Sequence, residues 1–257
     1  MPTAGAVRTS QRDPKIVWDG LWSHAPSDAR DDELIARERR SVRWKMVLDR
    51  LQEEFGGLAG LRTIELGSGR GDFSALLAQG GAKVTLLDAS EAGLNQARRR
   101  FGRLGIDGEF VRADLFDAAA TGYRGFDVSL SSGVIEHFLG QRRTEAVAAH
   151  RGVLRDGGLA VISVPNACCL SYRVWKRYLE LRRAWPYGVE VPYSRRELAR
   201  RGRAAGFRRV DATGAGFWHS VGDHVGKGLL GRGRDWAHCP SILDRAMGLS
   251  VVLFGLR

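Results

Sequence analysis

Thr63-Ile64-Glu65-Leu66-Gly67-Ser68-Gly69-Arg70-Gly71-Asp72 is the stretch of sequence that decides the fold. The apolar run with a β-branched centre that leads into it, Leu61 to Leu66, predicts a buried strand. Behind it, Phe73, Leu76 and Leu77 recur at helical spacing, so the glycines occupy a strand-to-helix turn. Glycine suits this turn because the chain reverses sharply and a ligand must approach the backbone with no Cβ in the way. The free N–H groups at the start of the helix then face that ligand.

The spacing of the glycines narrows the kind of ligand. They fall at positions 67, 69 and 71, a G-x-G-x-G pattern. A dinucleotide-binding turn reads G-x-G-x-x-G and holds a pyrophosphate at the helix end. The three glycines alone are weak support for a nucleotide-like ligand, so the prediction depends on residues further along the chain.

Length and composition indicate one large α/β domain with additions. The chain has 257 residues, of which 44% are hydrophobic and 27% are charged, ordinary values for a globular protein. No apolar run approaches the roughly 20 residues that span a bilayer, and Met1 to Gln11 lacks the apolar core of a signal peptide. The three cysteines form no disulfide framework, so a reducing cytoplasm is the expected compartment.

Strands and helices alternate after residue 61. The expected strands cover residues 62–66, 83–87, 109–113, 126–130, 159–164, 207–212 and 250–256. The expected helices between them cover residues 71–79, 90–104, 141–154 and 194–206. This order favours a doubly wound, mostly parallel sheet with helices on both faces, which binds its ligand at the carboxyl ends of the strands.

The chain divides into an N-terminal part, residues 1–57, and a domain over residues 58–257. A polar arm is expected through residue 15, then a turn that carries Trp18 and Trp22, then a single helix from Asp31 to Phe55. This helix is expected to end at a glycine pair, as helices commonly do.

Two acids follow the glycine turn. Asp88 ends the second strand, 21 residues after Gly67, where a carboxylate can accept both hydroxyls of a ribose. Asp114 ends the third strand, where it can accept the exocyclic amine of an adenine. The alternatives are that Asp88 caps the next helix and that Asp114 is an ordinary turn residue. The turn and both acids together are far more specific than any one of them.

Six motifs occur in a fixed order along the chain. They are Glu65-x-Gly67-x-Gly69-x-Gly71, Asp88, Ala113-Asp114, Phe126-Asp127-Val128 with Gly133-Val134-Ile135-Glu136-His137, Leu154-Arg155-Asp156-Gly157-Gly158, and Val161-Ile162-Ser163-Val164-Pro165-Asn166. This order resembles that of class I S-adenosylmethionine-dependent methyltransferases, most closely the subgroup that methylates quinones and natural products. The resemblance covers roughly residues 60–213 and is specific to the superfamily. It implies a seven-stranded sheet whose last strand, 250–256, runs antiparallel between the fifth and sixth.

The resemblance also implies S-adenosylmethionine as cofactor and assigns residues to it. The implied cofactor-binding residues are Glu65, Gly67, Ser68, Gly69, Gly71, Asp88, Ala89, Asp114, Leu115, Ser132 and Gly133. The glycine turn lies under the methionine part, the two acids hold the ribose and the adenine, and the end of the fourth strand lines the face to which the methyl group points.

Glu136 and His137 are the candidates for catalysis. Methyl transfer chiefly needs alignment of the two reactants. A base is needed only when the acceptor is a weakly acidic hydroxyl or a protonated amine. His137 titrates near physiological pH and directly follows the fourth strand, so the pair is a candidate base. The alternative is that both residues only open the next helix or brace the cofactor pocket.

Two segments interrupt the alternation, residues 166–192 and 214–248. The first is basic and aromatic, and the second is glycine-rich and expected to be irregular. We expect both, together with the N-terminal segment around Trp18 and Trp22, to form a lid over a small-molecule acceptor. Tyr172, Trp175 and Trp185 are its expected contacts. Packing of the insertions onto the sheet and peripheral contact with a membrane surface are the alternatives. A monomer and a homodimer are both compatible with the sequence.

Metal and nucleic acid are the remaining candidate ligands. The spacings of His219, Asp223, His224, His238 and Cys239 do not match a closed zinc site, so no metal is expected. The net charge of +11 invites nucleic acid, but much of it comes from arginines that we expect on solvated helix faces. These arginines are at positions 37, 39, 40, 43, 98, 99 and 100.

The predicted function is methyl transfer from S-adenosylmethionine to a small molecule, with a hydroxyl oxygen as the favoured acceptor. One alternative is a tRNA or rRNA methyltransferase. Nucleic-acid amine methylases of this fold resemble one another in an Asn/Asp-Pro-Pro-aromatic motif after the fourth strand, where this chain has Ser131-Ser132-Gly133-Val134. The other alternative is a partner protein that binds the cofactor without methylating.

Overall fold

The computed structural model describes residues 14–24, 26–231 and 234–257. Its centre is a seven-stranded sheet in the order β3-β2-β1-β4-β5-β7-β6. The strands are β1 (Arg62–Leu66), β2 (Lys83–Asp88), β3 (Glu109–Arg112), β4 (Phe126–Ser132), β5 (Leu154–Pro165), β6 (Arg209–Ala215) and β7 (Ser250–Leu256). The first five strands run parallel, and β7 is antiparallel to both of its neighbours. The predicted sheet is therefore confirmed, including the place and direction of its last strand.

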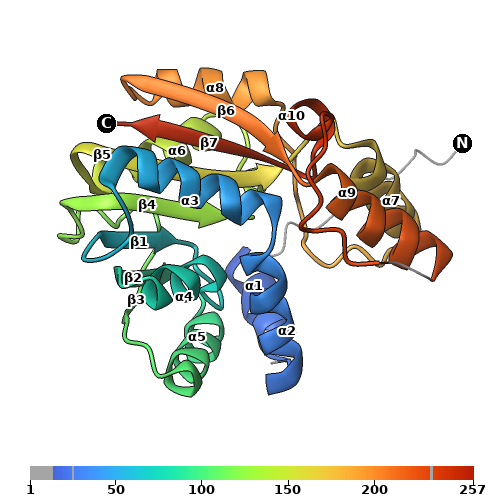
Figure 1. Ribbon diagram of the computed structural model, residues 1–257, viewed down its shortest axis with the longest axis horizontal. Helices are drawn as coiled ribbons and strands as arrows, with labels where there is room; N and C mark the ends of the chain where they lie inside the picture. The colour runs from blue at the N-terminus through green and yellow to red at the C-terminus, as the bar shows by residue number, and fades with distance from the viewer. Residues whose placement is uncertain (1–13, 25, 232–233) are drawn as a thin grey trace, which may run out of the picture.

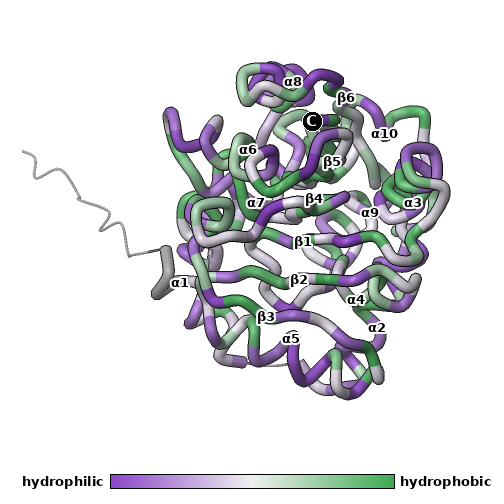
Figure 2. The backbone as a smooth tube through the Cα atoms, turned by 90° about the vertical axis from the view of Figure 1, so that its left-hand side faces the viewer, coloured by the Kyte–Doolittle hydropathy of each residue, from purple (hydrophilic) through white to green (hydrophobic). Residues whose placement is uncertain are grey.

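Helices cover both faces of the sheet, as Figure 2 shows with α3 and α4 to one side of the stacked strands and α6 to the other. On one face lie α3 (Val42–Phe55), α4 (Asp72–Gln79) and α5 (Glu91–Leu104), and their apolar residues share one core with side chains of β2, β4 and β5. On the other lie α6 (Arg142–Val153) and α8 (Arg195–Ala204), which form a second core against the sheet. Buried strands with apolar residues on both faces are what a parallel sheet requires.

The N-terminal part differs from the prediction in two places. The expected turn around Trp18 is the helix α1 (Pro14–Trp22), and the expected single helix is two, α2 (Asp28–Arg39) and α3. The break lies at Ser41, whose hydroxyl accepts a hydrogen bond from the backbone N–H of Trp44 at 3.0 Å and so starts a new helix. The polar arm expected through residue 15 lies, up to residue 13, outside the described residues. The division of the chain at residue 57 stays a prediction. The helix α3, which precedes that position, packs into the core of the sheet.

The second insertion was expected to be irregular, and this was wrong. It contains α9 (Phe217–Ser220), the π-helix η2 (Val221–Leu229) and α10 (Asp244–Met247). The first insertion forms α7 (Leu170–Leu181), which packs against η2. Figure 1 shows α7 and α9 at the end of the sheet to which the parallel strands point. In the parts of the chain that the structure describes, we find no helix with the length and apolar character needed to cross a bilayer.

His150 on α6 gives the fold a defined pH dependence. The side chain is fully buried, its Nδ1 lies 3.2 Å from the Ser129 hydroxyl, and its Nε2 has no partner among the described residues. Burial lowers the pKa of His150 from 6.5 to about 3. In the unfolded chain His150 therefore binds a proton near pH 6.5, whereas in the folded protein it binds one only near pH 3. As the pH falls through that window, the free energy of unfolding should decrease by about 1.4 kcal/mol per pH unit.

We expect His150→Leu to remove this slope, as measured by urea unfolding between pH 4 and pH 7. The matched control is His238→Leu, because His238 is exposed and its replacement leaves the buried site intact. Equal slopes in the wild-type protein and in His150→Leu would show that another group controls the acid unfolding.

Candidate active site

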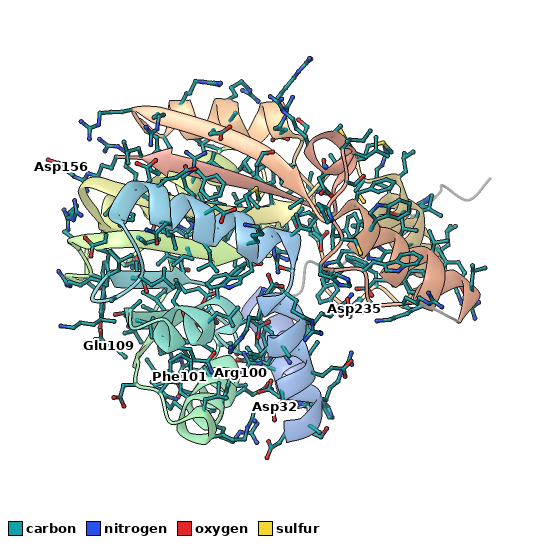
Figure 3. The ribbon with its side chains drawn as sticks, in the orientation of Figure 1. Asp32, Arg100, Phe101, Glu109, Asp156 and Asp235 are labelled. Atoms are coloured by element: carbon teal, nitrogen blue, oxygen red, sulfur yellow. The ribbon has the colours of Figure 1, made fainter. Side chains whose placement is uncertain are left out.

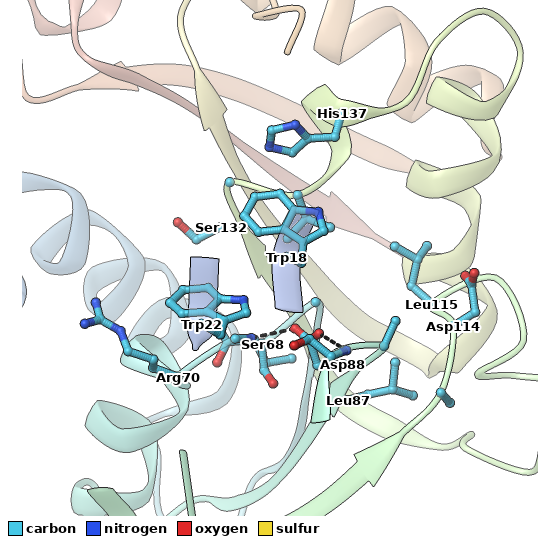
Figure 4. Close-up of a pocket in the computed structure, with 18 of the residues that line it drawn as sticks. Trp18, Trp22, Ser68, Arg70, Leu87, Asp88, Asp114, Leu115, Ser132 and His137 are labelled. Atoms are coloured by element: carbon cyan, nitrogen blue, oxygen red, sulfur yellow. Dashed lines mark hydrogen bonds between the residues drawn. The ribbon is translucent and has the colours of Figure 1, made fainter. Parts of the chain in front are cut away.

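A cavity of about 500 Å³ opens at the carboxyl ends of β1, β2 and β4 (Figure 4). The glycine turn forms one wall and α1 lies against it. Among the predicted cofactor residues, those that line this cavity are Glu65, Gly67, Ser68, Gly69, Asp88, Ala89, Asp114, Leu115, Ser132 and Gly133. Thus ten of the eleven predicted residues meet around one space. Gly71, the eleventh, lies behind the turn at the start of α4.

The glycine turn needs glycine for measurable reasons. Gly67, Gly69 and Gly71 have φ values of 71°, 50° and 69°, which side-chain-bearing residues rarely adopt. A Cβ on Gly69 would also lie 2.6 Å from the Trp22 ring, and one on Gly71 would overlap a Leu86 methyl group. Side chains at these positions would therefore collide with Trp22 at the cavity and with Leu86 in the core.

Asp88 lies at the floor of the cavity. It is 9% exposed, and its two carboxylate oxygens each accept a hydrogen bond of 2.7 Å, one from the N–H of Gly69 and one from that of Ser90. Burial raises the pKa of Asp88. A carboxylate oxygen has two lone pairs, so each oxygen keeps one for a ligand hydroxyl. Asp88 thus both braces the glycine turn and remains able to bind a ribose.

Glu65 has a different surrounding from the one expected. Its Oε2 accepts hydrogen bonds from the backbone N–H of Ser74 at 3.0 Å and from the Ser74 hydroxyl at 2.6 Å. Burial raises the pKa of Glu65 to about 7. Because Ser74 belongs to the first turn of α4, this carboxyl caps the helix. Its contact with a ligand stays a prediction.

The rim of the cavity suits a flat ring. Leu115 is buried, and the rings of Phe116 and Phe138 lie 5.0 Å apart edge to face. The Arg142 guanidinium lies 4.3 Å from the centre of the Phe116 ring. Asp114 is exposed at this rim, and its carboxylate accepts a hydrogen bond of 3.0 Å from the N–H of Phe116.

The structure adds two aromatic residues that the sequence reasoning did not assign to the cofactor site. Trp18 and Trp22 on α1 both line the cavity, with their ring centres 6.4 Å apart. The carbonyl of Trp22 accepts a hydrogen bond from Gln96, and Ser90 donates to Asp19 at 2.6 Å, so α1 is anchored to α5. The sequence signal for this arrangement was the i, i+4 spacing of Trp18 and Trp22, because that spacing places two side chains on the same face of a helix.

Arg43 is the other residue that the sequence reasoning missed. We expected it on a solvated helix face, and this was wrong: it is half-buried and lines the cavity. Its Nη1 donates to the Ser132 hydroxyl at 3.0 Å, and its Nη2 lies 2.7 Å from Glu38. Helical periodicity carries no signal for this position, because its burial depends on the ends of β4 and β5.

Glu136 and His137 lie in a single 3-10 turn, η1 (Ile135–His137), directly after β4. Nδ1 of His137 lies 2.7 Å from the carbonyl oxygen of Val189. A carbonyl only accepts, so Nδ1 carries the proton and Nε2 has the free lone pair. Nε2 lies 3.9 Å from Oε1 of Glu136. Burial lowers the pKa of His137 and raises that of Glu136 well above its usual value.

His137 also reaches the cofactor cavity. It lines the cavity wall, and the Trp18 ring lies 4.8 Å from its imidazole, edge to face (Figure 4). The imidazole therefore lies at the wall of the cavity, with its unprotonated nitrogen beside the buried Glu136 carboxyl. That is a position from which a group can act on an acceptor.

Tyr172, Trp175 and Trp185 do not line the cavity. The Tyr172 and Trp185 rings lie 6.3 Å apart, and Trp175 stacks on Tyr178 at 5.4 Å. The cluster joins η1 through the N–H of Val191, which donates to the Glu136 carbonyl at 2.9 Å. Contact of these three residues with an acceptor stays a prediction.

The histidines and acids of the second insertion, considered above for zinc, have other contacts. Asp223 lies 2.6 Å from Nη2 of Arg37 and 3.2 Å from Nε2 of His219. Nδ1 of His224 lies 2.9 Å from the Ser220 hydroxyl. These contacts tie η2 to α2 and stabilise the insertion.

The cavity residues fit S-adenosylmethionine. The Ser68 hydroxyl is buried with no hydrogen-bond partner among the described residues, so it is available to a ligand. The glycine turn presents backbone without Cβ atoms. Asp88 offers free lone pairs to hydroxyls, and the Arg43 guanidinium, which Glu38 holds in place, lines the same cavity. The aromatic rim accommodates a purine.

Asp88→Ala is expected to raise the dissociation constant for S-adenosylmethionine by roughly 10- to 150-fold, because charge-assisted hydrogen bonds to the ribose are lost. Calorimetric titration measures this change. The matched control is Asp117→Ala, since Asp117 is exposed and outside the cavity. An unchanged affinity in Asp88→Ala would show that this carboxylate serves only the turn.

The chain is similar to known methyltransferases. The family model of the methyltransferase domain matches residues 64–158. A ubiquinone biosynthesis O-methyltransferase of Aromatoleum aromaticum is 30% identical over 171 residues, which are 63% of this chain and 70% of the relative. Another from Sinorhizobium fredii is 29% identical over 187 residues, 68% of this chain and 74% of the relative.

Solved structures show the same fold. Magnesium protoporphyrin IX methyltransferase from Synechocystis PCC 6803 with bound SAH has a TM-score of 0.58 at 16% identity, and covers 94% of each chain. A Burkholderia thailandensis 1,6-didemethyltoxoflavin-N1-methyltransferase with bound S-adenosylhomocysteine has a TM-score of 0.59 at 18% identity, covering 99% of this chain and 91% of the other. These structures share the fold, and the sequence relatives with the matching family model show that the chain belongs to the class I S-adenosylmethionine-dependent methyltransferases.

Proposed function

We propose that this methyltransferase acts on a hydroxyl oxygen of a small-molecule acceptor. The observation that carries the proposal is His137 at the wall of the cofactor cavity, with the buried Glu136 carboxyl beside it. A hydroxyl is a poor nucleophile until its proton is removed or polarised. The free lone pair on Nε2 of His137 is suited to this task, and a neutral amine would not need it. The similarity to ubiquinone biosynthesis O-methyltransferases supports the same class of acceptor.

The cofactor supplies an electrophilic methyl group on a sulfonium cation. In our proposal Gly67, Ser68 and Gly69 hold its methionine part. Asp88 holds the ribose. Ser132 and Gly133, which line the cavity, lie beside the reacting end in this proposal, and Figure 4 shows Ser132 between Ser68 and His137.

The walls of the cavity indicate the character of the acceptor. Trp18, Trp22 and Phe138 are large apolar surfaces, and the Arg70 guanidinium lies 5.6 Å from the centre of the Trp22 ring. Such walls exclude water and hold an apolar or aromatic molecule near the reacting atoms. We therefore propose an acceptor with an apolar or aromatic body and one hydroxyl directed toward His137.

The test is turnover of methyl-labelled S-adenosylmethionine with paired acceptors. Each pair consists of a phenol or hydroxy compound and the amine of the same shape. We expect label in O-methyl products and little in the N-methyl products. Label only in the amines would exclude the oxygen acceptor. Cofactor binding without any turnover, in acceptors and in fractionated cell extract, would favour the alternative of a non-methylating partner.

A nucleic-acid substrate has less support. Several arginines that contribute to the basic charge are paired with acids in the structure. These are Arg37, Arg50, Arg100, Arg103 and Arg155. We expect binding to DNA or RNA to be indifferent to sequence and to collapse between low and moderate salt. Methylation of one RNA at physiological salt would contradict this.

A further inference from the structure

We propose that a strap, residues 189–193, positions the imidazole of His137 and that Arg143 is the residue that holds this strap in place. The strap lies between α7 and α8 and runs beside the turn η1. Neither Arg143 nor the strap lines the cofactor cavity, so both act on the reaction through His137. The inference rests on the proposed function, in which His137 takes the proton of the acceptor hydroxyl.

The strap contacts His137 and the residue before it through backbone groups. The Val189 carbonyl accepts a hydrogen bond of 2.7 Å from Nδ1 of His137, and the N–H of Val191 donates to the carbonyl of Glu136 at 2.9 Å. The first bond decides which ring nitrogen carries the proton. The second holds the peptide group that joins Glu136 to His137. The ring and the backbone of His137 are therefore both fixed by the same segment.

Tyr193 anchors the end of the strap. The residue is fully buried, and its hydroxyl donates to the carbonyl of Ile135 at 3.3 Å. Its N–H donates to the carbonyl of Pro165 at 3.0 Å, and its own carbonyl accepts from the N–H of Ala167 at 2.9 Å. Because Pro165 ends β5, these bonds tie the strap to the central sheet. All three residues of η1 thus bond to the strap.

The turn η1 has little support of its own. It contains three residues, and its backbone bonds run from His137 to the carbonyl of Val134 at 3.2 Å and from Phe138 to that of Ile135 at 3.4 Å. Both are longer than the common value of about 2.9 Å, and hydrogen bonds in 3-10 turns have poorer geometry than those in α-helices. The position of His137 therefore depends on the strap.

Arg143 on α6 contacts the strap in two places. Its Nη1 donates to the carbonyl of Val191 at 2.9 Å, and its guanidinium carbon lies 3.5 Å from the centre of the Tyr193 ring. Its Nε donates to Glu197 on α8 at 3.2 Å, which supplies the opposite charge. The residue is only 4% exposed, and a buried guanidinium requires acceptors for its N–H groups. Arg143 and the strap therefore hold one another in one arrangement.

The first test needs no acceptor. Nitrogen-15 NMR spectra of the imidazoles distinguish Nδ1–H from Nε2–H, and His137→Ala identifies the signals of His137. They are recorded in the complex with S-adenosylhomocysteine, at a pH where the imidazole is neutral. In the wild-type protein we expect the Nδ1–H form of His137 alone. In Arg143→Met, where the strap is no longer held, we expect a mixture of both forms.

The second test separates kcat from binding. With a hydroxyl acceptor, Arg143→Met should lower kcat by roughly 10- to 100-fold, since a displacement of about 1 Å can cost that much. The dissociation constant for S-adenosylhomocysteine should be unchanged, because Arg143 does not line the cavity. The matched control is Arg196→Met, which replaces an exposed arginine on α8 and should leave the spectrum, kcat and binding unchanged.

Tyr193→Phe is the milder variant, and it decides if Arg143→Met does not fold. It keeps the ring beside Arg143 and removes only the hydroxyl that bonds to Ile135. We expect kcat to fall by roughly three- to tenfold, the range for loss of one hydrogen bond. The tautomer of His137 should shift in the same direction as in Arg143→Met.

Two results would overturn the inference. One is the Nδ1–H form alone in both variants together with the wild-type kcat, which would leave the proposed function standing. The other is an equal loss of kcat and of affinity for S-adenosylhomocysteine, because Arg143 would then support the fold and not His137. A changed tautomer without methylation of any hydroxyl would support the role of the strap and remove the proposed function.

Discussion

Arg100→Ala is expected to lower the free energy of unfolding by about 3–5 kcal/mol, the range for removing one partner of a buried ion pair. Arg100 belongs to α5, its side chain is 2% exposed, and it pairs with Asp31 of α2 and Asp72 of α4 (Figure 3). Its Nε donates to Asp31 at 2.9 Å, its Nη2 also pairs with Asp31, and its Nη1 pairs with Asp72. Without it, the buried carboxylate of Asp31 keeps only Arg103.

The same substitution should also weaken cofactor binding. Nη1 of Arg100 donates to the carbonyl of Arg70 at 3.0 Å, within the glycine turn. Thermal unfolding measures the first effect, and a loss of this size corresponds to roughly 6–20 °C in Tm for a chain of this length. The matched control is Arg99→Ala, since Arg99 is exposed and adjacent on the same helix. Its effect should stay within about 0.5 kcal/mol. Equal melting temperatures in the two variants would show that Asp31 and Asp72 are stable without Arg100.

The glycine turn and the sheet could be predicted because their signals are local. A strand, a turn with three glycines and a helix are encoded within ten or so neighbouring residues. The end of α5 and the bounds of β7 agree with the prediction to the residue. Gly105 caps the helix, and the short apolar run 250–256 is typical of a buried strand. The order of the strands came from the resemblance, not from periodicity.

The remaining features depend on contacts between distant parts of the chain. Trp22 approaches Gly69, and Arg43 reaches Ser132 across 89 positions. Neither contact leaves a pattern in the residues around it, so the sequence predicts a turn in place of α1 and a surface position for Arg43.

His137→Ala is expected to lower kcat by roughly 10²- to 10⁴-fold, the range for loss of a group that handles a proton. The dissociation constant for S-adenosylhomocysteine should be unchanged, because Asp88 and the glycine turn do not contact the imidazole. Steady-state kinetics with the best acceptor and a calorimetric titration of the product measure the two quantities. The control is His219→Ala, which removes an imidazole bonded to Asp223 on η2. Its kcat should match the wild-type value.

The acidity of the acceptor distinguishes a chemical role of His137 from a structural one. If the imidazole promotes loss of the hydroxyl proton, its removal should matter less for acceptors that are already ionised. Across a series of substituted phenols, the loss of kcat in His137→Ala should therefore shrink as the pKa of the phenol falls below the assay pH. A loss of the same size for every phenol would show that His137 supports only the wall of the cavity, through its contacts with Trp18 and Val189.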